Sequence, residues 1–166
     1  DFYKFNPFHQ WAASLGYIAL SMNFRLSSGF GRELVSAGQK EYGGKAHEDV
    51  LDAVEACIRK KLTSRGSLAI FGGSYGGYEV LASLAFSPDY FSCGISICPP
   101  SNLISLLKKF PNYWEWTPYP FADNKKFFTK VDFIQNMGGD PDKPEDMEFL
   151  ASCSPLYFTG QIKAPL

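Results

Sequence analysis

The stretch "LAIFGGSYGGYEVLASLAF", residues 68–86, decides the fold because it joins an apolar run, a glycine-flanked serine and a helical pattern. Residues 67–71 are typical of a buried strand, and residues 75–86 have the apolar spacing of a helix. Ser74 lies between the two in the pattern Gly-x-Ser-x-Gly. This pattern at a strand-to-helix junction predicts a nucleophile elbow over residues 70–77, which would present the serine hydroxyl above the carboxyl end of a sheet.

Each residue of such an elbow has an expected role. Ser74 would be a nucleophile, and the backbone N–H of Tyr75 would stabilise an oxyanion at the positive end of the following helix. The flanking glycines would be needed because side chains there would collide in a strained turn. The alternative is a tight strand-to-helix turn in which Ser74 only caps the helix.

The rest of the chain alternates strands and helices. We expect a helix over residues 7–15, a buried strand over 17–24, a helix over 47–62 and a strand over 93–98. Together with the stretch around Ser74, this order predicts an α/β fold with parallel strands and right-handed crossovers. After that, residues 100–151 are expected to form an irregular helical insert.

Composition limits the classes of function. The 166 residues are 45% hydrophobic and 20% charged with a net charge of −1, which is typical of a folded domain and gives no argument for nucleic acid or an anionic membrane surface. No apolar run approaches the roughly 20 residues of a membrane span, and no signal peptide is visible at the N-terminus.

The four cysteines have neither Cys-x-x-Cys spacing nor neighbouring histidines, so we expect no metal and no cofactor. We expect them to be buried free thiols, which favours a reducing compartment such as the cytoplasm. They are Cys57, Cys93, Cys98 and Cys153.

Around Ser74 the chain resembles the prolyl oligopeptidase family of serine peptidases, in particular its acylaminoacyl-peptidase and dipeptidyl-peptidase-like members. The segment "GGSYGGY" is similar to that family's nucleophile signature. Four further stretches resemble family members, and they cover residues 14–34, 41–54, 87–103 and 154–166. Two positions depart from the family pattern and affect the expected packing of one loop: Leu26 stands where glycine is usual, and Tyr42 where tryptophan is usual.

The resemblance implies an α/β-hydrolase fold with a doubly wound, mostly parallel sheet, truncated at both ends, of which residues 1–166 would be the central part. It also implies hydrolysis of peptides through an acyl-Ser74 intermediate. The ring of Tyr75 would form a wall of the pocket for the residue before the scissile bond. Further pocket residues would be Pro100, Leu103, Leu106 and Trp114, and for Trp114 the alternative is ordinary packing within the helical insert. A β-propeller domain would restrict substrate size in the full-length protein.

A serine hydroxyl needs a base, and the chain offers no obvious one. In α/β-hydrolases the triad follows the order Ser, Asp or Glu, His, whereas His9 and His47 both precede Ser74. We expect His9 on the surface of an amphipathic helix and His47 in a solvated or capping position. The aspartates after Ser74 are expected to be loop and helix-cap carboxylates: Asp123, Asp132, Asp140, Asp142 and Asp146.

The resemblance implies that the triad Asp and His lie beyond Leu166, and this chain alone is expected to be inactive. Two alternatives stay open. One is an esterase of the same fold, and the other is a catalytically inactive remnant or binding module. Arg25 is expected to anchor a loop, with a carboxylate clamp as the alternative.

Overall fold

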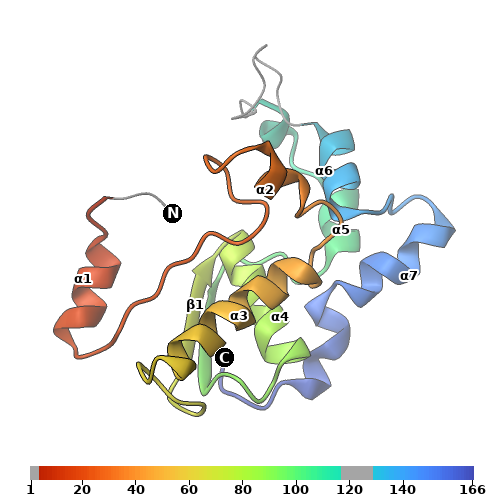
Figure 1. The fold of residues 1–166 in the computed structure, drawn as a ribbon. Coiled ribbons are helices and arrows are strands. Elements are labelled where there is room, and N and C mark those ends of the chain that lie inside the picture. The colour runs from red at the N-terminus through yellow and green to blue at the C-terminus, as the bar shows by residue number, and fades with distance from the viewer. Residues whose placement is uncertain (1–3, 117–128) are drawn as a thin grey trace.

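The computed structural model describes residues 4–116 and 129–166, so the expectation for Asp123 lies outside the described residues. Its centre is a strand–helix–strand unit (Figure 1). Strands β1 (Ala69–Gly73) and β2 (Cys93–Ile97) pair in parallel and in register, and helix α4 (Tyr75–Phe86) connects them. This unit confirms the α/β class. Within the described residues the sheet has these two strands, so the doubly wound arrangement stays a prediction.

The remaining elements are helical and surround this unit (Figure 1). Their bounds are α1 Pro7–Ser14, α2 Arg32–Ser36, α3 Lys45–Arg59, α5 Leu103–Lys108, the 3₁₀ helix η1 Asn112–Trp116, α6 Lys130–Met137, α7 Pro144–Ser152 and the 3₁₀ helix η2 Pro155–Gln161. The helices from α5 to α7 fall in the stretch expected to be an irregular insert.

Helix α4 is the central element of the core, because every residue from Gly77 to Ala85 is buried. It packs on two sides, as expected for a helix that is apolar around most of its circumference. On one side it meets α3 and the sheet, through a buried cluster of Val54, Val80, Leu84 and Phe91 against which Ile70 of β1 also packs. On the other it meets α5, α6 and α7, through a cluster of Tyr78, Ala82, Leu103, Ile104, Leu107, Met137, Leu150 and Cys153.

The expected buried strand over residues 17–24 is absent from the described structure. The segment is irregular, and Tyr17 and Ile18 are 67% and 69% exposed. A strand is stable only when a neighbouring strand satisfies its backbone N–H and C=O groups, and neither β1 nor β2 pairs with this segment. The prediction of a strand here was wrong for this chain because the apolar pattern alone does not supply a partner.

Two helix predictions hold with shifted ends. Helix α1 begins at Pro7, and the side chain of Asn6 accepts hydrogen bonds from two N–H groups of its first turn. Helix α3 was expected to reach Leu62 but ends at Arg59. Lys61 then adopts a positive φ of 57°, and the side chain of Leu62 is left exposed. The last apolar residue of the pattern therefore lies outside the helix.

All four cysteines are free thiols, but their burial differs. Cys153 is buried as expected, and its burial raises the pKa of the thiol. Cys57 and Cys93 are half-buried. Cys98 is exposed, which contradicts the expectation of a buried thiol. It follows the last residue of β2, where the chain leaves the sheet with a positive φ of 44°.

The acidic residues after α4 act locally, as expected for loop and cap carboxylates. Asp132 forms a capping box with Thr129 at the start of α6. The carboxylate of Asp146 accepts from the N–H of Asp140, and that of Asp140 accepts from the N–H of Asp142. In the part of the chain that the structure describes, no group of three or more His, Cys, Asp or Glu side chains could hold a metal ion. None of the helices in that part is long and apolar enough to cross a membrane.

Candidate active site at the strand-to-helix turn

Ser74 lies in the turn between β1 and α4 with a strained backbone. Its φ of 56° and ψ of −119° are uncommon for a residue with a side chain, and such a conformation costs about 1–3 kcal/mol. The turn is held by a hydrogen bond from the N–H of Ser74 to the carbonyl oxygen of Ile97, at 2.9 Å. The side chain is exposed and makes no capping hydrogen bond, so the simple N-cap alternative lacks its defining contact.

The glycines of the turn are needed for steric reasons at two positions. A Cβ on Gly72 would lie 2.2 Å from the carbonyl oxygen of Gly76, and one on Gly77 would lie 2.9 Å from the carbonyl oxygen of Ile97. The expectation that side chains at the flanking glycines would collide is therefore confirmed for Gly72. It is wrong for Gly73, where a Cβ would come no closer than 3.9 Å to Ile97, and for Gly76, where a Cβ would meet no described atom within 4 Å apart from its chain neighbours and the backbone of its own helix.

Tyr75 is the first residue of α4, so its N–H has no acceptor within the helix and is free by position to bind an anion. Its ring contacts three other rings. It stacks on Phe24 with centroids 5.3 Å apart, meets Tyr42 edge-on at 5.0 Å, and lies 5.6 Å from Tyr78. Tyr42, one of the two positions expected to depart from the family pattern, therefore packs directly against the residue next to Ser74.

The hydroxyl of Tyr75 donates a 2.7 Å hydrogen bond to Oε1 of Glu79, one turn further along α4. Burial, followed by the nearby Glu79 carboxylate, raises the pKa of Tyr75 far above its ordinary value. The same two causes raise the pKa values of Tyr42 and Tyr78. All three phenols therefore stay protonated at any working pH, and Tyr75 stays a hydrogen-bond donor.

His47 is buried, which contradicts the expectation of a solvated or capping histidine. It is 4% exposed and its Nε2 lies 2.9 Å from Oγ of Ser87. Its Nδ1 lies 3.7 Å from Oε2 of Glu79. The pattern "KAHED" is polar in sequence, but the first turn of α3 faces α4 and takes His47 with it. His47 thus contacts Ser87, at the C-terminal end of α4, and Glu79, in its second turn, and its contacts within the described residues include none with Ser74, so they do not place it as a base for Ser74.

His9 lies on α1, half-exposed, with Nε2 2.7 Å from Oγ of Ser21. This surface position agrees with the expectation. Glu79, in contrast, was missed by the sequence analysis. The available signal was a single charged residue inside an otherwise apolar helix, because a buried carboxylate needs partners and so indicates a polar network.

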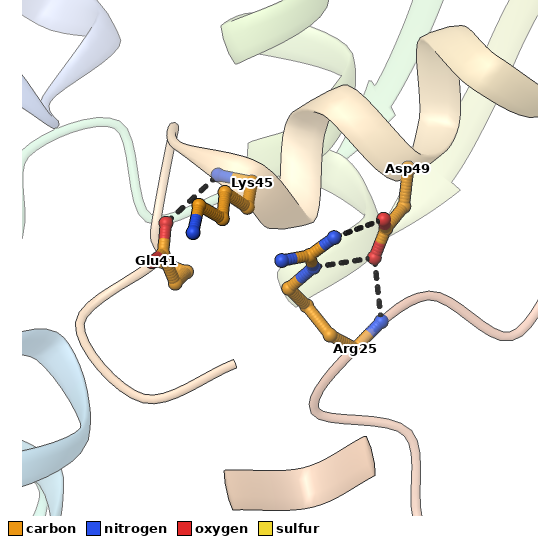
Figure 2. A network of polar contacts seen from close by, with 4 residues as sticks. All are labelled: Arg25, Glu41, Lys45 and Asp49. Atoms are coloured by element: carbon orange, nitrogen blue, oxygen red, sulfur yellow. Dashed lines mark hydrogen bonds and ion pairs between the residues drawn. The ribbon is translucent and has the colours of Figure 1, made fainter. Parts of the chain in front are cut away.

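Arg25 anchors the loop between α1 and α2 to Asp49 of α3, as expected of a loop anchor. Its Nε and backbone N–H both donate to Oδ2 of Asp49, at 2.7 and 2.9 Å, and its second guanidinium nitrogen reaches Oδ1 (Figure 2). The guanidinium lowers the pKa of the Asp49 carboxyl, chiefly through this hydrogen bonding. Nearby, the carboxylate of Glu41 accepts from the N–H of Lys45 at the start of α3 (Figure 2). The pairing of Arg25 with Asp49 therefore ties to α3 the loop that carries Phe24, whose ring stacks on Tyr75.

The expected pocket residues lie in different surroundings. Pro100 and Leu106 are half-buried, whereas Leu103 is completely buried in the core cluster beside Tyr78. Trp114 is half-buried, and its ring stacks on Phe133 and meets Phe110 edge-on. Only Leu106 and Leu103 share a cluster with the ring of Tyr75.

Comparison with known proteins identifies the family to which the chain is related. The model of the prolyl oligopeptidase family matches residues 3–147. The chain belongs to this family. It is 42% identical to dipeptidyl peptidase family member 6 of Caenorhabditis elegans and 41% identical to dipeptidyl aminopeptidase BIII of Pseudoxanthomonas mexicana, in both cases over its whole length. It spans 21% and 22% of the length of these relatives.

A solved structure gives the same result for the fold. The uncomplexed acylaminoacyl peptidase of Pyrococcus horikoshii matches 87% of this chain and 21% of its own length, with a TM-score of 0.66 and 27% identity. The small parallel sheet and its helices thus correspond to part of the α/β-hydrolase catalytic domain of these serine peptidases.

Proposed function

We propose that this chain supplies the nucleophile and one oxyanion donor of a serine peptidase. The observation that carries the proposal is the exposed Ser74 on a strained turn at the positive end of α4. A hydroxyl held there is accessible to substrate, and negative charge that develops beside it meets the N–H groups of the helix N-terminus.

The reaction would proceed in two steps. In the first, a base removes the proton of Ser74 as its Oγ attacks the peptide carbonyl carbon, and the resulting oxyanion accepts a hydrogen bond from the N–H of Tyr75. The C–N bond then breaks, the amine takes the proton, and an acyl-Ser74 ester remains. In the second step, water activated by the same base releases the acid and restores the serine. We propose that the base, a His, and its Asp partner belong to a longer protein that continues past Leu166.

The substrates would be peptides, as the names of the dipeptidyl peptidase and acylaminoacyl peptidase relatives suggest. The ring of Tyr75 would form part of the pocket for the residue before the scissile bond, with Pro100, Leu106 and Trp114 as further contacts. Leu103 would support this wall from the core, since its side chain is completely buried. The lengths of the relatives are consistent with further domains, and we propose a β-propeller among them.

Parallel kinetics on a peptide amide and a carboxylic ester would test the proposal in the longer protein. We expect hydrolysis of the peptide, at least a hundredfold loss with Ser74→Ala, and no loss with the control Ser105→Ala, an exposed serine on α5. Turnover of the ester alone would favour an esterase of the same fold. No turnover of either substrate would favour an inactive remnant.

A further inference from the structure

The most unusual group near Ser74 is the carboxylate of Glu79. It is 3% exposed on a helix whose neighbouring positions are almost all apolar, and its Oε2 has no hydrogen-bond partner among the described residues. Burying a charged group costs free energy, and a well-packed apolar residue in its place is often neutral or stabilising. Stability alone therefore gives no reason for a carboxylate at this position.

The contacts of Glu79 point toward Tyr75. Side chains on a helix lean toward its N-terminus, so a residue at position i+4 can reach back one turn. Glu79 does so, and its Oε1 accepts the Tyr75 hydroxyl at 2.7 Å. On the other side, His47 of α3 faces Oε2, with Nδ1 at 3.7 Å.

The ring of Tyr75 is thereby restrained at both ends. Phe24, Tyr42 and Tyr78 pack against the ring, and Glu79 holds the hydroxyl at its tip. The ring contacts restrain the ring itself, and the hydrogen bond restrains the hydroxyl at its tip. A ring fixed in this way presents one constant surface next to the nucleophile.

We propose that Glu79 is a positioning residue that sets the specificity of the site by holding the Tyr75 ring through its hydroxyl. The proposal rests on the proposed peptidase function, in which the Tyr75 ring is a wall of the substrate pocket. Glu79 itself does not touch substrate. Its effect passes through one hydrogen bond, so it depends on an acceptor at position 79 and a donor at position 75.

The test is a set of four variants of the longer active protein: Glu79→Leu, Glu79→Gln, Tyr75→Phe, and Tyr75→Phe with Glu79→Leu. The readout is the ratio of kcat/KM for two peptide substrates, one with a large apolar residue before the scissile bond and one with glycine there. This ratio does not change when a variant merely lowers the fraction of folded enzyme.

We expect the ratio to fall about fivefold in Glu79→Leu and in Tyr75→Phe, the size of effect that one net hydrogen bond gives. The effect should lie mainly in KM for the large substrate. The double variant should show no further fall, and Glu79→Gln, which keeps an acceptor, should stay near the wild-type ratio. An unchanged ratio in Glu79→Leu, additive effects in the double variant, or equal losses for Gln and Leu would each overturn the proposal.

Two measurements keep the test decisive. If Glu79→Leu does not fold, Tyr75→Phe breaks the same hydrogen bond from the other side, and a wild-type ratio in that variant overturns the proposal.

If the wild-type protein hydrolyses neither substrate, the peptidase function fails separately. In that case ¹⁹F NMR of protein labelled with 3-fluorotyrosine reports the mobility of the Tyr75 ring directly. The Tyr75 resonance, assigned by its loss in Tyr75→Phe, should be single and sharp in wild type and in Glu79→Gln. If it is equally sharp in Glu79→Leu, Glu79 does not hold the ring.

Discussion

Replacing Gly72 by alanine should damage the turn far more than the same change at Gly76, although both glycines belong to one motif. A Cβ at position 72 would lie 2.2 Å from the carbonyl oxygen and 2.3 Å from the carbonyl carbon of Gly76, well short of the 3.4 Å at which ordinary contact begins. Both atoms are backbone, so the clash cannot be relieved by turning a side chain. The turn that carries Ser74 must open instead.

The magnitude follows from these contacts. Overpacking a well-packed site costs about 1–3 kcal/mol, and a clash with backbone at this distance places Gly72→Ala at about 3 kcal/mol. Gly76→Ala is the matched control, because a Cβ there meets no described atom within 4 Å apart from its chain neighbours and the backbone of its own helix. Gly76 lies inside α4, where alanine is favoured over glycine by about 1 kcal/mol, so this variant should be neutral or more stable.

Urea unfolding followed by tryptophan fluorescence would measure both free energies of unfolding. In the longer protein that continues past Leu166, the rate at which a fluorophosphonate labels Ser74 would report the geometry of the turn. We expect Gly72→Ala to lose stability and labelling together, while Gly76→Ala keeps both. Equal losses in the two variants, or a harmless Gly72→Ala, would refute the steric account of the turn.

Three further predictions concern the surroundings of the site. Asp49→Asn should lower the free energy of unfolding by about 1–2 kcal/mol at pH 7. Because its arginine partner lowers the pKa of Asp49, this stabilisation is complete above the unfolded-state pKa of about 4 and is lost as the pH falls through the lower folded-state pKa. The free energies of unfolding of wild type and variant, measured by urea denaturation, should therefore converge in strong acid. Gly38→Ala should lower the free energy of unfolding by about 1–3 kcal/mol, since a Cβ there would lie 2.3 Å from Cγ of Leu26. Leu26→Gly, which also relieves a positive φ of 81°, should restore part of this loss in the double variant. Fully additive changes in the free energy of unfolding would contradict this. In the native chain a disulfide reagent should modify the exposed Cys98 first and the buried Cys153 only on unfolding, and a fast phase that survives Cys98→Ser would contradict the observed burial.

The strand–turn–helix unit could be predicted from sequence because its signals are local. A short apolar run, a glycine-rich turn and a helical spacing follow one another between residues 68 and 86, and the helix over residues 75–86 forms with the expected bounds. The stretch over residues 17–24 has an equally clear apolar pattern and forms no strand. A strand depends on its neighbour as much as on its own residues, and sequence pattern does not show which neighbour is present.

The buried polar contacts beside the site could not be predicted from local sequence either, because they also depend on partners that are distant in the chain. His47 belongs to a polar stretch, yet the packing of α3 on α4 buries it against Ser87 and Glu79. Burial of a polar residue is set by the partner that satisfies it, and that partner here lies more than thirty residues away. A lone Glu79 within an apolar helix was the one visible signal of this network, because such a residue is uncommon unless paired.

Reaction of Ser74 with a fluorophosphonate tests the central claim most directly. The comparison includes the 166-residue chain, a longer protein that continues past Leu166, and Ser74→Ala in the longer protein, with peptide mapping to locate the adduct. We predict an adduct on Ser74 in the longer protein, none after Ser74→Ala, and none on the 166-residue chain, which holds no histidine after Ser74. An adduct on the short chain would contradict the claim that its base lies elsewhere, and absence of an adduct from the longer protein would contradict the assignment of Ser74 as nucleophile.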